Sequence, residues 1–501
     1  MLKTGPLPKK RHRGRSLHPS AEPGTHNIRH PSQSEEVTQN LRKHPSLTMT
    51  RLCSPQRGAQ RVFIAFFLIQ FISTHAWTTP NPVRIQTSSL AASQAIVDDA
   101  STAGKKEPKP ALSPLSLTMD ELGHKLGGRG RAQSCWDCYR EGIDPLWYFG
   151  DESDVEDAGI LGDGWTHLQL QQVMSGRRAD HGLGRKSLDI LERKFGTIEE
   201  KVASLSKISV SQDGTTKLLL KLVADGLEVE TVIIPFSDRE KSTLCVSSQI
   251  GCKQACTFCM TGRMGKLRNL SADEILAQLF WANKACRVRN IYPIDNIVFM
   301  GMGEPADNVG PVVQSANVMV DPILFQLAPR RVTISTVAPT PDAFEELGKS
   351  NVVLAWSIHA SRDHVRQELV PTTKHSMEEL RDGLSRTLQQ RTKRLRNTML
   401  EIALLDNIND SEEDALHLVE FCKPLLDQVQ GIKLVVNLIP WNDIGAQSGP
   451  ASGYRRPSMS RVLAFQKILV DNSILCYVRT TRGDDENAAC GMLATKKNNS
   501  Q

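Results

Sequence analysis

The sequence lacks an apolar run long enough to cross a membrane. The apolar stretch at residues 62–72 spans about eleven residues, whereas a bilayer-spanning helix takes roughly twenty. Basic residues at Arg51, Arg57 and Arg61 precede this stretch, and small residues up to Ala76 follow it, which is the layout of a secretory signal peptide. A buried core helix is the alternative. We therefore expect no stable membrane insertion.

Residues 1–114 are predicted to be a targeting leader and linker. A signal-peptide-like segment at 49–76 opens at Met49, which is also an alternative start of the chain. A transit-like segment at 77–114 follows; it opens with Trp77 and is rich in Ser, Thr and Ala. This order resembles the bipartite leaders of proteins imported into secondary plastids of algae. We expect a plastid (chloroplast) location, with the mitochondrion or cytoplasm as alternatives.

Positive charge and cysteine are both scarce over most of the chain. The net charge is +6, but residues 1–60 carry 11 Lys or Arg against three Glu, so the other 441 residues sum to about −2. Whole-chain charge therefore gives no argument for nucleic-acid binding, and any basic surface must be local. Eleven cysteines in 501 residues are too few for a disulfide scaffold, and four of them fall within residues 245–259. This clustering indicates metal or redox chemistry.

A glycine-rich dinucleotide loop is also missing from the second half of the chain, where apolar strands alternate with amphipathic helices. Buried β-branched runs separated by helices indicate a parallel sheet. Without that loop, the pattern favours an α/β fold with a full or partial (β/α) barrel over residues 242–495 rather than a doubly wound sheet. Active-site residues should then lie at the carboxyl ends of the strands. The predicted strands are 244–248, 296–300, 331–336, 352–358, 399–405, 433–439 and 474–479.

Residues 115–241 are predicted to form a small accessory region before the barrel. Its first part, to about Ser211, is expected to be mixed helix and loop, and the acidic tract 151–157 within it is interpreted as a solvated insertion. Turn signals at 213–214 and 225–226 then separate two β-rich segments. Tight turns of this kind are typical of hairpins, so we expect a small β-meander that leads into the barrel.

Three cysteines form the strongest chemical signal. Cys252, Cys256 and Cys259 make a CxxxCxxC motif in the loop after the first predicted barrel strand. Three thiolates suit a 4Fe-4S cluster that leaves one iron open; a zinc site is the alternative, but zinc normally takes four protein ligands. An open iron can bind S-adenosylmethionine (SAM) and deliver the electron that cleaves it to a 5′-deoxyadenosyl radical. The motif is the hallmark of the radical SAM superfamily, which this chain resembles.

Polar residues at the ends of later strands are predicted to bind SAM. The segment 301–305, Gly-Met-Gly-Glu-Pro, directly follows a strand; its glycines allow close backbone approach, and Glu304 can accept from an ammonium group. Any one such residue alone would more often be an ordinary turn or core residue. Several that converge on one barrel face are better interpreted as a ligand shell. The others are Ser335, Ser357, His359 and Asn437.

Two further cysteines are candidates for the reaction itself. Cys245 lies in the first barrel strand, and Cys490 lies near the carboxyl end. As lone residues both would be interpreted as inert buried thiols; two sulfurs beside a radical site could instead act as a methyl carrier and a resolving thiol. Cys135 and Cys138 could form a redox or zinc pair, but no partner pair accompanies them.

These motifs closely resemble one family, the dual-specificity RNA adenine carbon-2 methyltransferases of the RlmN type. The resemblance covers residues 217–493. It implies a radical SAM partial (β/α) barrel with a small N-terminal helical domain that reads RNA, and residues 130–136 resemble part of that domain. The matching motifs are LCVSSQIGC at 244–252, MGMGEP at 300–305, RRVTIST at 330–336, WSIHA at 356–360 and DENAACG at 485–491.

The resemblance implies a mechanism that uses a methylated cysteine. Cys490 takes a methyl group from a first SAM and a second SAM is cleaved to the radical, so two SAM are used per turnover. Once the carbon has joined adenine, Cys245 helps to resolve the adduct as a disulfide forms with Cys490. Glu230 matches the family's proton acceptor. The residues expected to contact SAM are Gly303, Glu304, Ser335, Ser357, Ile358, His359 and Asn437.

The expected function is methylation of carbon 2 of an adenine in large-subunit (23S-type) ribosomal RNA, with transfer RNA as a second substrate. Methylation of carbon 8 is one alternative. Another is a non-catalytic iron-sulfur protein that binds RNA or assists ribosome assembly, although the presence of both Cys245 and Cys490 argues against it. The implied partners are RNA and an electron donor such as flavodoxin or ferredoxin, and we expect a monomer.

Overall fold

The computed structural model describes residues 113–150 and 155–494. The predicted targeting leader, apart from its last two residues, lies outside the described residues, so the expected location stays a prediction. None of the described helices is both long and apolar enough to cross a membrane.

One ten-stranded sheet organises the described chain, in the order β1-β2-β3-β4-β7-β8-β9-β10-β11-β12. Neighbours from β1 to β4 are antiparallel, and those from β4 to β12 are parallel. A separate antiparallel pair, β5 and β6, flanks the sheet. The strands are β1 Ala203–Val210, β2 Thr216–Leu222, β3 Glu228–Phe236, β4 Lys241–Cys245, β5 Gln249–Gly251, β6 Lys266–Asn269, β7 Ile294–Phe299, β8 Val332–Thr336, β9 Val353–Ser357, β10 Asn397–Leu404, β11 Lys433–Pro440 and β12 Leu475–Val478.

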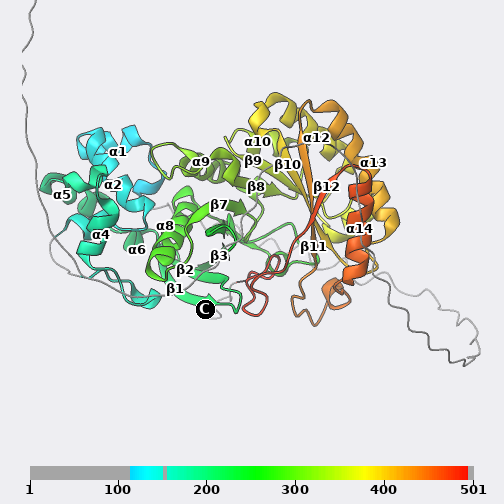
Figure 1. The fold of residues 1–501 in the computed structure, drawn as a ribbon, viewed down its shortest axis with the longest axis horizontal. Coiled ribbons are helices and arrows are strands. Elements are labelled where there is room, and N and C mark those ends of the chain that lie inside the picture. The colour runs from blue at the N-terminus through cyan, green and yellow to red at the C-terminus, as the bar shows by residue number, and fades with distance from the viewer. Residues whose placement is uncertain (1–112, 151–154, 495–501) are drawn as a thin grey trace, which may run out of the picture. The chain divides into compact units, whose positions relative to one another are not determined.

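Helices connect the parallel strands in succession and lie on the outer side of the curved sheet (Figure 1). Ser-x-x-Glu capping boxes start two of them: Ser271 with Glu274, and Ser376 with Glu379. In the described chain the sheet ends at β1 and β12 without closing, which confirms the predicted α/β partial barrel. The helices are α7 Met260–Arg263, α8 Ala272–Val288, α9 Val309–Val320, α10 Asp342–Gly348, α11 Asp363–Leu369, α12 Met377–Gln390, α13 Glu412–Gln428 and α14 Met459–Asp471, with short 3-10 turns at Pro305–Asp307, Pro329–Arg331, Lys393–Leu395 and Pro450–Ser452.

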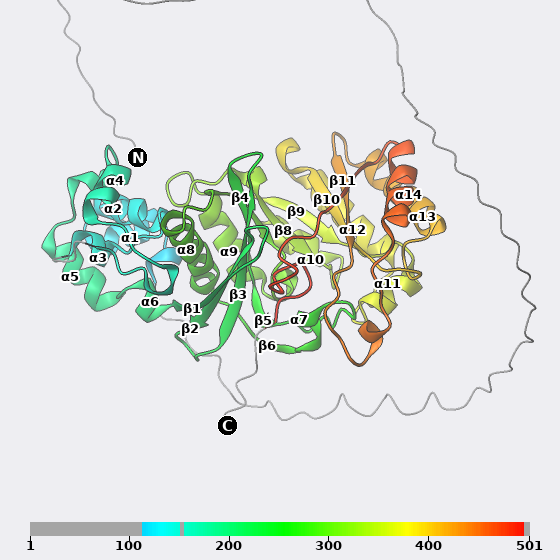
Figure 2. The same ribbon diagram turned by 60° about the horizontal axis from the view of Figure 1, so that its bottom comes forward.

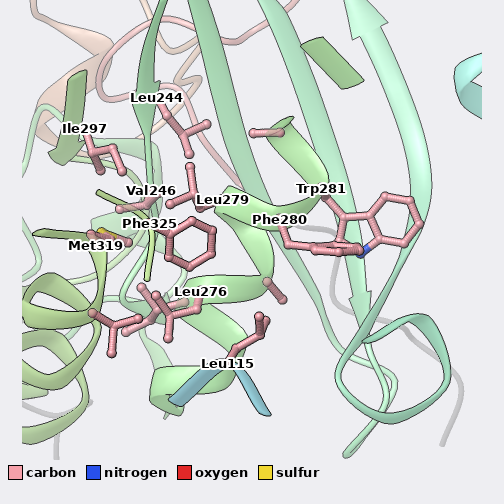
Figure 3. Close-up of a cluster of buried hydrophobic side chains, with 14 of the residues drawn as sticks. Leu115, Leu244, Val246, Leu276, Leu279, Phe280, Trp281, Ile297, Met319 and Phe325 are labelled. Atoms are coloured by element: carbon pink, nitrogen blue, oxygen red, sulfur yellow. The ribbon is translucent and has the colours of Figure 1, made fainter. Parts of the chain in front are cut away.

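The accessory helices gather beside α8, where they appear in cyan and blue-green in Figure 1. Their side chains join those of the barrel in one hydrophobic core: Leu115 lies in it with Phe280 and Trp281 of α8 and Leu244 of β4 (Figure 3). This shared core makes the helices part of one folded body with the sheet. The elements are α1 Met119–Leu126, α2 Arg129–Arg140, α3 Pro145–Phe149, α4 His167–Met174, α5 Arg185–Lys194 and α6 Ile198–Lys201, with 3-10 turns at Pro114–Ser116, Gly159–Leu161 and Arg178–His181.

The structure corrects two details predicted for the accessory region. Residues 203–210, expected to be helix or loop, form β1, which is the outer edge strand of the β-meander; the meander joins the barrel strands through β4, which pairs with β7. The acidic tract 151–157 was interpreted as a solvated insertion; residues 151–154 lie outside the described residues and Asp157 is exposed, but Glu156 is only 5% exposed. Its carboxylate pairs with both terminal nitrogens of Arg287 on α8, at 2.6 and 2.9 Å. The predicted turns between β1, β2 and β3 are confirmed.

Candidate active site

The three motif cysteines lie on one loop that runs from β5 through α7 to β6. Backbone hydrogen bonds hold this loop. The Cys252 N–H donates to the Gly265 carbonyl at 3.1 Å and joins the two ends of the loop, and the Cys259 N–H donates to the Cys256 carbonyl at 3.1 Å within it. In the middle, Thr257 is held by the Leu369 carbonyl, which accepts its N–H at 3.0 Å. The loop therefore has a defined shape set by the protein itself.

The donor set of this loop fits an iron-sulfur cluster. All three thiols are free rather than disulfide bonded. Burial raises the pKa of Cys252 to about 12 and holds that of Cys256 well above its usual range, and neighbouring thiols add to both shifts. Buried thiols that repel one another as thiolates need a cation, which a cluster provides. Among the described residues no three His, Cys, Asp or Glu side chains could hold one metal ion; cysteines of a cubane ligate different irons, so they need not converge on one point.

Aromatic contacts fix the loop beside the barrel. The ring of Phe258, between the second and third cysteines, lies 4.5 Å from the His359 ring, centroid to centroid. Its carbonyl accepts the indole N–H of Trp441 at 3.0 Å. Burial holds the pKa of His359 well below its usual range, with the Arg366 charge as a second cause. Nδ1 of this neutral imidazole accepts the Ala403 N–H at 3.2 Å. His359 therefore supports the cysteine loop.

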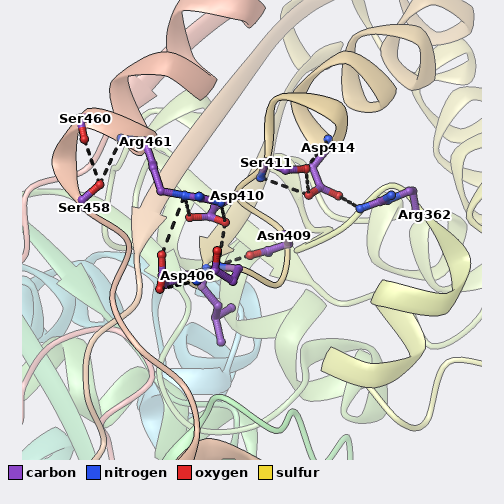
Figure 4. Close-up of polar contacts among 11 residues, drawn as sticks. Arg362, Asp406, Asn409, Asp410, Ser411, Asp414, Ser458, Ser460 and Arg461 are labelled. Atoms are coloured by element: carbon purple, nitrogen blue, oxygen red, sulfur yellow. Dashed lines mark hydrogen bonds and ion pairs between the residues drawn. The ribbon is translucent and has the colours of Figure 1, made fainter. Parts of the chain in front are cut away.

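The loop after β10, whose Asn409 and Asp410 are labelled in Figure 4, also holds the backbone of His359. Asn409 Nδ2 donates to the His359 carbonyl at 2.7 Å. Two ion pairs flank Asn409. Asp410 pairs with Arg461 of α14 at 2.6 Å, and Asp414 pairs with Arg362. The carboxylate of Asp410 is fully buried, while the side chain of Arg461 reaches the surface and is 40% exposed. These contacts connect α14 and the first turn of α13 to His359, whose ring packs against Phe258 of the cysteine loop.

The Gly-Met-Gly-Glu-Pro segment follows β7 as predicted, and it packs tightly. Gly303 has φ +97°, and a Cβ there would lie 2.5 Å from Gln249 Cβ, so only glycine fits. The next N–H, of Glu304, donates to Gln249 Oε1 at 2.8 Å. The carboxylate of Glu304 accepts from the Val337 N–H at 3.0 Å, from the Ala306 N–H at 2.9 Å and from the Thr336 hydroxyl. Burial raises its pKa to about 7.

The remaining predicted SAM residues are brought onto neighbouring strands. Ser335 of β8 and Ser357 of β9 are hydrogen bonded through their hydroxyls at 2.9 Å. Asn437 lies in the middle of β11 rather than at its end. The Ile358 side chain is buried, while its carbonyl accepts from Arg366 at 2.7 Å. The two serines thus lie on adjacent strands, Ile358 directly follows β9, and Asn437 lies one strand beyond β10; the contact of all four with SAM stays a prediction.

A cavity of about 540 Å³ opens inside the barrel and unites the two candidate reactive thiols. Cys245, at the end of β4, and Cys490 both line it, together with Asn437, Glu401 and Arg479. Burial raises the pKa of Cys245 to about 12 and that of Cys490 to about 11, while the Arg479 charge lowers both. Cys490 is exposed to solvent and lines this cavity. Both thiols are free in the structure, so no disulfide joins them here.

The carboxyl-terminal segment carries Cys490 back from β12 toward the cysteine loop (Figure 2). The Met260 N–H donates to the Gly491 carbonyl at 2.8 Å, and the Thr261 hydroxyl donates to the Leu493 carbonyl at 2.6 Å. Asn442 Nδ2 donates to the Cys490 carbonyl at 3.2 Å. Since Met260 and Thr261 directly follow Cys259, these bonds fix Cys490 beside the predicted cluster.

Glu230, the predicted proton acceptor, lies on β3 and is 5% exposed. Lys217 Nζ lies 3.0 Å from its Oε1, and the Ala494 N–H donates to Oε2 at 2.9 Å. Burial raises its pKa despite the lysine. The structure therefore shows Glu230 anchoring the segment that follows Cys490, and its role in proton transfer stays a prediction.

Two cysteines of the accessory region do not join the site. Cys135 and Cys138 are fully buried in α2, and burial raises the pKa of Cys135 strongly. Such thiols are inert core residues. Conversely, three charged residues of the site were not predicted from the sequence: Glu401, Arg479 and Arg366. Arg366 is fully buried and donates to the carbonyls of Ser357, at 2.8 Å, and Ile358, at 2.7 Å, and also to that of Val337.

Comparisons with known proteins agree with this geometry. The Radical SAM superfamily model matches residues 246–419. A dual-specificity RNA methyltransferase RlmN from Marinobacter nauticus is 37% identical over 342 residues, which cover 66% of this chain and 87% of the relative. The crystal structure of a radical SAM methyltransferase from Sphaerobacter thermophilus superposes with a TM-score of 0.59 at 29% identity, over 77% of this chain and 99% of that one. The protein therefore belongs to the RlmN family and is a SAM-dependent radical SAM RNA methyltransferase.

Proposed function

We propose that this enzyme methylates carbon 2 of an adenine in large-subunit ribosomal RNA, with transfer RNA as a second substrate. The observation that supports this most directly is the pairing of Cys245 and Cys490 in one cavity beside the cysteine loop. A simple SAM methyltransferase needs no protein thiol; a chemistry that carries the methyl group on sulfur needs one thiol to carry it and another to release it.

The three loop cysteines, Cys252, Cys256 and Cys259, would hold the 4Fe-4S cluster. SAM would lie against Gly303, Glu304 and the polar residues of β8, β9 and β11. When bound, the cluster and SAM supply the 5′-deoxyadenosyl radical that removes a hydrogen atom from a methyl group. Because a methyl donor and a radical source are separate requirements, we propose that two SAM are used per turnover.

Each thiol has a distinct part in the proposed reaction. The Cys490 sulfur loses its proton and takes the methyl group as the methyl–sulfonium bond of the first SAM breaks and S-adenosylhomocysteine leaves; the nearby Arg479 charge favours the Cys490 thiolate. After the carbon has bonded to adenine, the Cys245 sulfur attacks the Cys490 sulfur. A sulfur–sulfur bond forms as the carbon–sulfur bond to the product breaks, and the electron pair of the broken bond stays on the carbon, which takes up a proton and becomes the methyl group. For the step to balance, the adduct gives up one electron, which the oxidised cluster would take back, together with the proton of adenine carbon 2, and the Cys245 thiol supplies a sulfur that has lost its proton. Glu230 is the proposed proton acceptor. Its carboxylate accepts the Ala494 N–H and so lies against the segment that follows Cys490.

Two aspects of this proposal concern partners and location. Flavodoxin or ferredoxin is the proposed electron donor, since a one-electron reductant must supply the cluster, and the enzyme is proposed to act as a monomer. The leader-like composition of residues 49–114 supports import into a plastid.

The test is anaerobic reconstitution with iron and sulfide, followed by reaction with SAM, a reductant and ribosomal or transfer RNA. Mass spectrometry of digested RNA should detect 2-methyladenosine, and chromatography should detect 5′-deoxyadenosine. The C490A variant should keep its cluster and make no methyladenosine, while C286A, which changes a cysteine of α8 outside the site, should match wild type. Formation of 8-methyladenosine alone would overturn the carbon-2 assignment.

A further inference from the structure

Glu401 on β10 carries a carboxylate oxygen without a hydrogen-bond partner. The residue is 2% exposed. Its Oε1 accepts from Asn437 Nδ2 at 2.8 Å, but its Oε2 has no such partner among the described residues. Arg479 Nη1 lies 3.5 Å from Oε2 and forms an ion pair with it, without the geometry of a hydrogen bond. A buried acceptor in this state costs stability unless a ligand completes it.

The strand register places Glu401 in the middle of the predicted SAM residues. Glu401 pairs with Ser357 of β9 on one side and with Asn437 of β11 on the other. Directly paired residues of neighbouring strands point to the same face of a sheet. That face is the cavity wall, because both Glu401 and Asn437 line the cavity. Glu401 therefore lies in the wall of the cavity, and its Oε2 is shielded from solvent just behind that wall.

The chemistry of a carboxylate restricts what can complete it. An ionised carboxylate only accepts hydrogen bonds, so the ligand must bring an O–H or N–H group. Carboxylates bind ribose hydroxyls in dinucleotide sites, and SAM carries a ribose with two neighbouring hydroxyls. We propose that Glu401 is a further SAM-binding residue, whose Oε2 accepts a hydrogen bond from a ribose hydroxyl of SAM. The inference rests on the proposed placement of SAM against Ser357 and Asn437.

Arg479 and Asn437 give Glu401 a fixed direction. Asn437 holds Oε1, and the guanidinium supplies a countercharge behind Oε2. An anchored acceptor needs no reorganisation when the hydroxyl arrives, which favours binding. The same hydroxyl chemistry could come from the ribose of the RNA nucleoside, so the experiment must separate the two sources.

The test measures binding of S-adenosylhomocysteine, a non-reacting analogue of SAM, to the anaerobically reconstituted holoenzyme without RNA. Calorimetry gives the dissociation constants for the analogue and for its 2′-deoxy and 3′-deoxy forms. In wild type, loss of the contacted hydroxyl should weaken binding about 10- to 100-fold, as expected for a hydrogen bond to a charged group. In Glu401→Gln the same loss should matter far less, because the charged acceptor is gone.

Matched variants make the outcome decisive. Glu420→Gln changes an exposed glutamate of α13, which pairs with Lys423, and should retain the wild-type response. Cluster absorbance and thermal melting establish that each variant is folded; if Glu401→Gln is not, Glu401→Asp draws the carboxylate back by one methylene and gives the same comparison.

If removal of a ribose hydroxyl from the analogue weakens binding by the same factor in wild type and in Glu401→Gln, the inference is overturned. Unchanged analogue affinity combined with a raised KM for RNA would also overturn it and would assign Oε2 to the RNA ribose. Wild type that binds the analogue as expected but methylates no RNA would overturn the proposed substrate alone. Wild type that fails to bind the analogue would overturn the proposed SAM site and the inference together.

Discussion

Arg366 illustrates how a single buried charge shapes the site. Its guanidinium joins the ends of β8 and β9 through the carbonyls of Val337, Ser357 and Ile358. Burial lowers its pKa to about 10, so the charge persists at neutral pH. The planar fork of arginine can reach several carbonyls at once, and lysine cannot. Arg366 therefore determines the spacing of two strand ends that carry predicted SAM residues.

Arg366→Lys should consequently destabilise the protein by about 2–4 kcal/mol, because buried carbonyls lose their donors. Urea denaturation measures the loss, and the affinity for S-adenosylhomocysteine should fall with it. Arg394→Lys, on the exposed surface before β10, serves as control. An Arg366→Lys protein as stable as wild type would refute the bridging role.

Asp144 should give the protein a measurable pH dependence. Burial raises its pKa from 3.8 to about 6, despite hydrogen bonds from the N–H groups of Ile198 and Leu146. Between these values the folded protein retains a proton that the unfolded chain has released. The stabilising contribution is therefore full below about pH 4 and is lost as the pH rises through about 6.

Lowering the pH from 7 to 5 should thus stabilise wild type relative to Asp144→Asn by about 1 kcal/mol. Denaturation midpoints of the two proteins at both pH values provide the measurement. Asp163→Asn, at an exposed position, should behave as wild type. If the difference in free energy of unfolding between wild type and Asp144→Asn did not change with pH, the buried carboxyl would not be the source of the pH dependence.

At the scale of elements, the turn between β1 and β2 holds the segment that carries Cys490. Asp485 accepts from the Gln212 N–H at 3.0 Å and from the Ser211 hydroxyl, and Lys217 donates to the Asn487 carbonyl at 3.2 Å. The β-meander is therefore more than a link between the accessory helices and the barrel. It sets where the reactive thiol lies.

Asp485→Ala should release this segment and slow RNA methylation about 10- to 100-fold, since small misplacements of a reactive group reduce rates strongly. The affinity for S-adenosylhomocysteine should stay unchanged, because the SAM residues lie on other strands. Asp484→Ala, one residue earlier and also exposed, is the matched control. Equal rates for the two variants would argue against the anchoring role.

Elements with a local signal could be predicted from the sequence, and those defined by distant contacts could not. The barrel strands and the cysteine loop follow from apolar periodicity and thiol spacing. β1 was missed because its side chains alternate poorly and only its pairing with β2 makes it a strand. Glu401 and Arg366 gave no local signal, since their partners lie on other strands. Glu156 looked solvated because Arg287 is far away in the sequence.

At the scale of the whole molecule, the accessory helices and the barrel share one core, so they should unfold together. Gly142, with φ +66°, lies against α8. A Cβ there would come within 2.3 Å of the backbone nitrogen of Lys284 and 2.6 Å of the carbonyl oxygen of Phe280. Gly142→Ala must therefore push the accessory region away from α8. The matched control is Gly182→Ala, at a similar φ of +77° but with open space around it.

Gly182→Ala should cost only the left-handed backbone penalty, about 1 kcal/mol. Gly142→Ala should cost about 3 kcal/mol or more, because overpacking adds to the same penalty. Melting followed by circular dichroism and by the absorbance of the reconstituted cluster should shift to the same lower temperature in Gly142→Ala. Melting of the helices at a temperature where the cluster absorbance persists would show instead that the two regions fold independently.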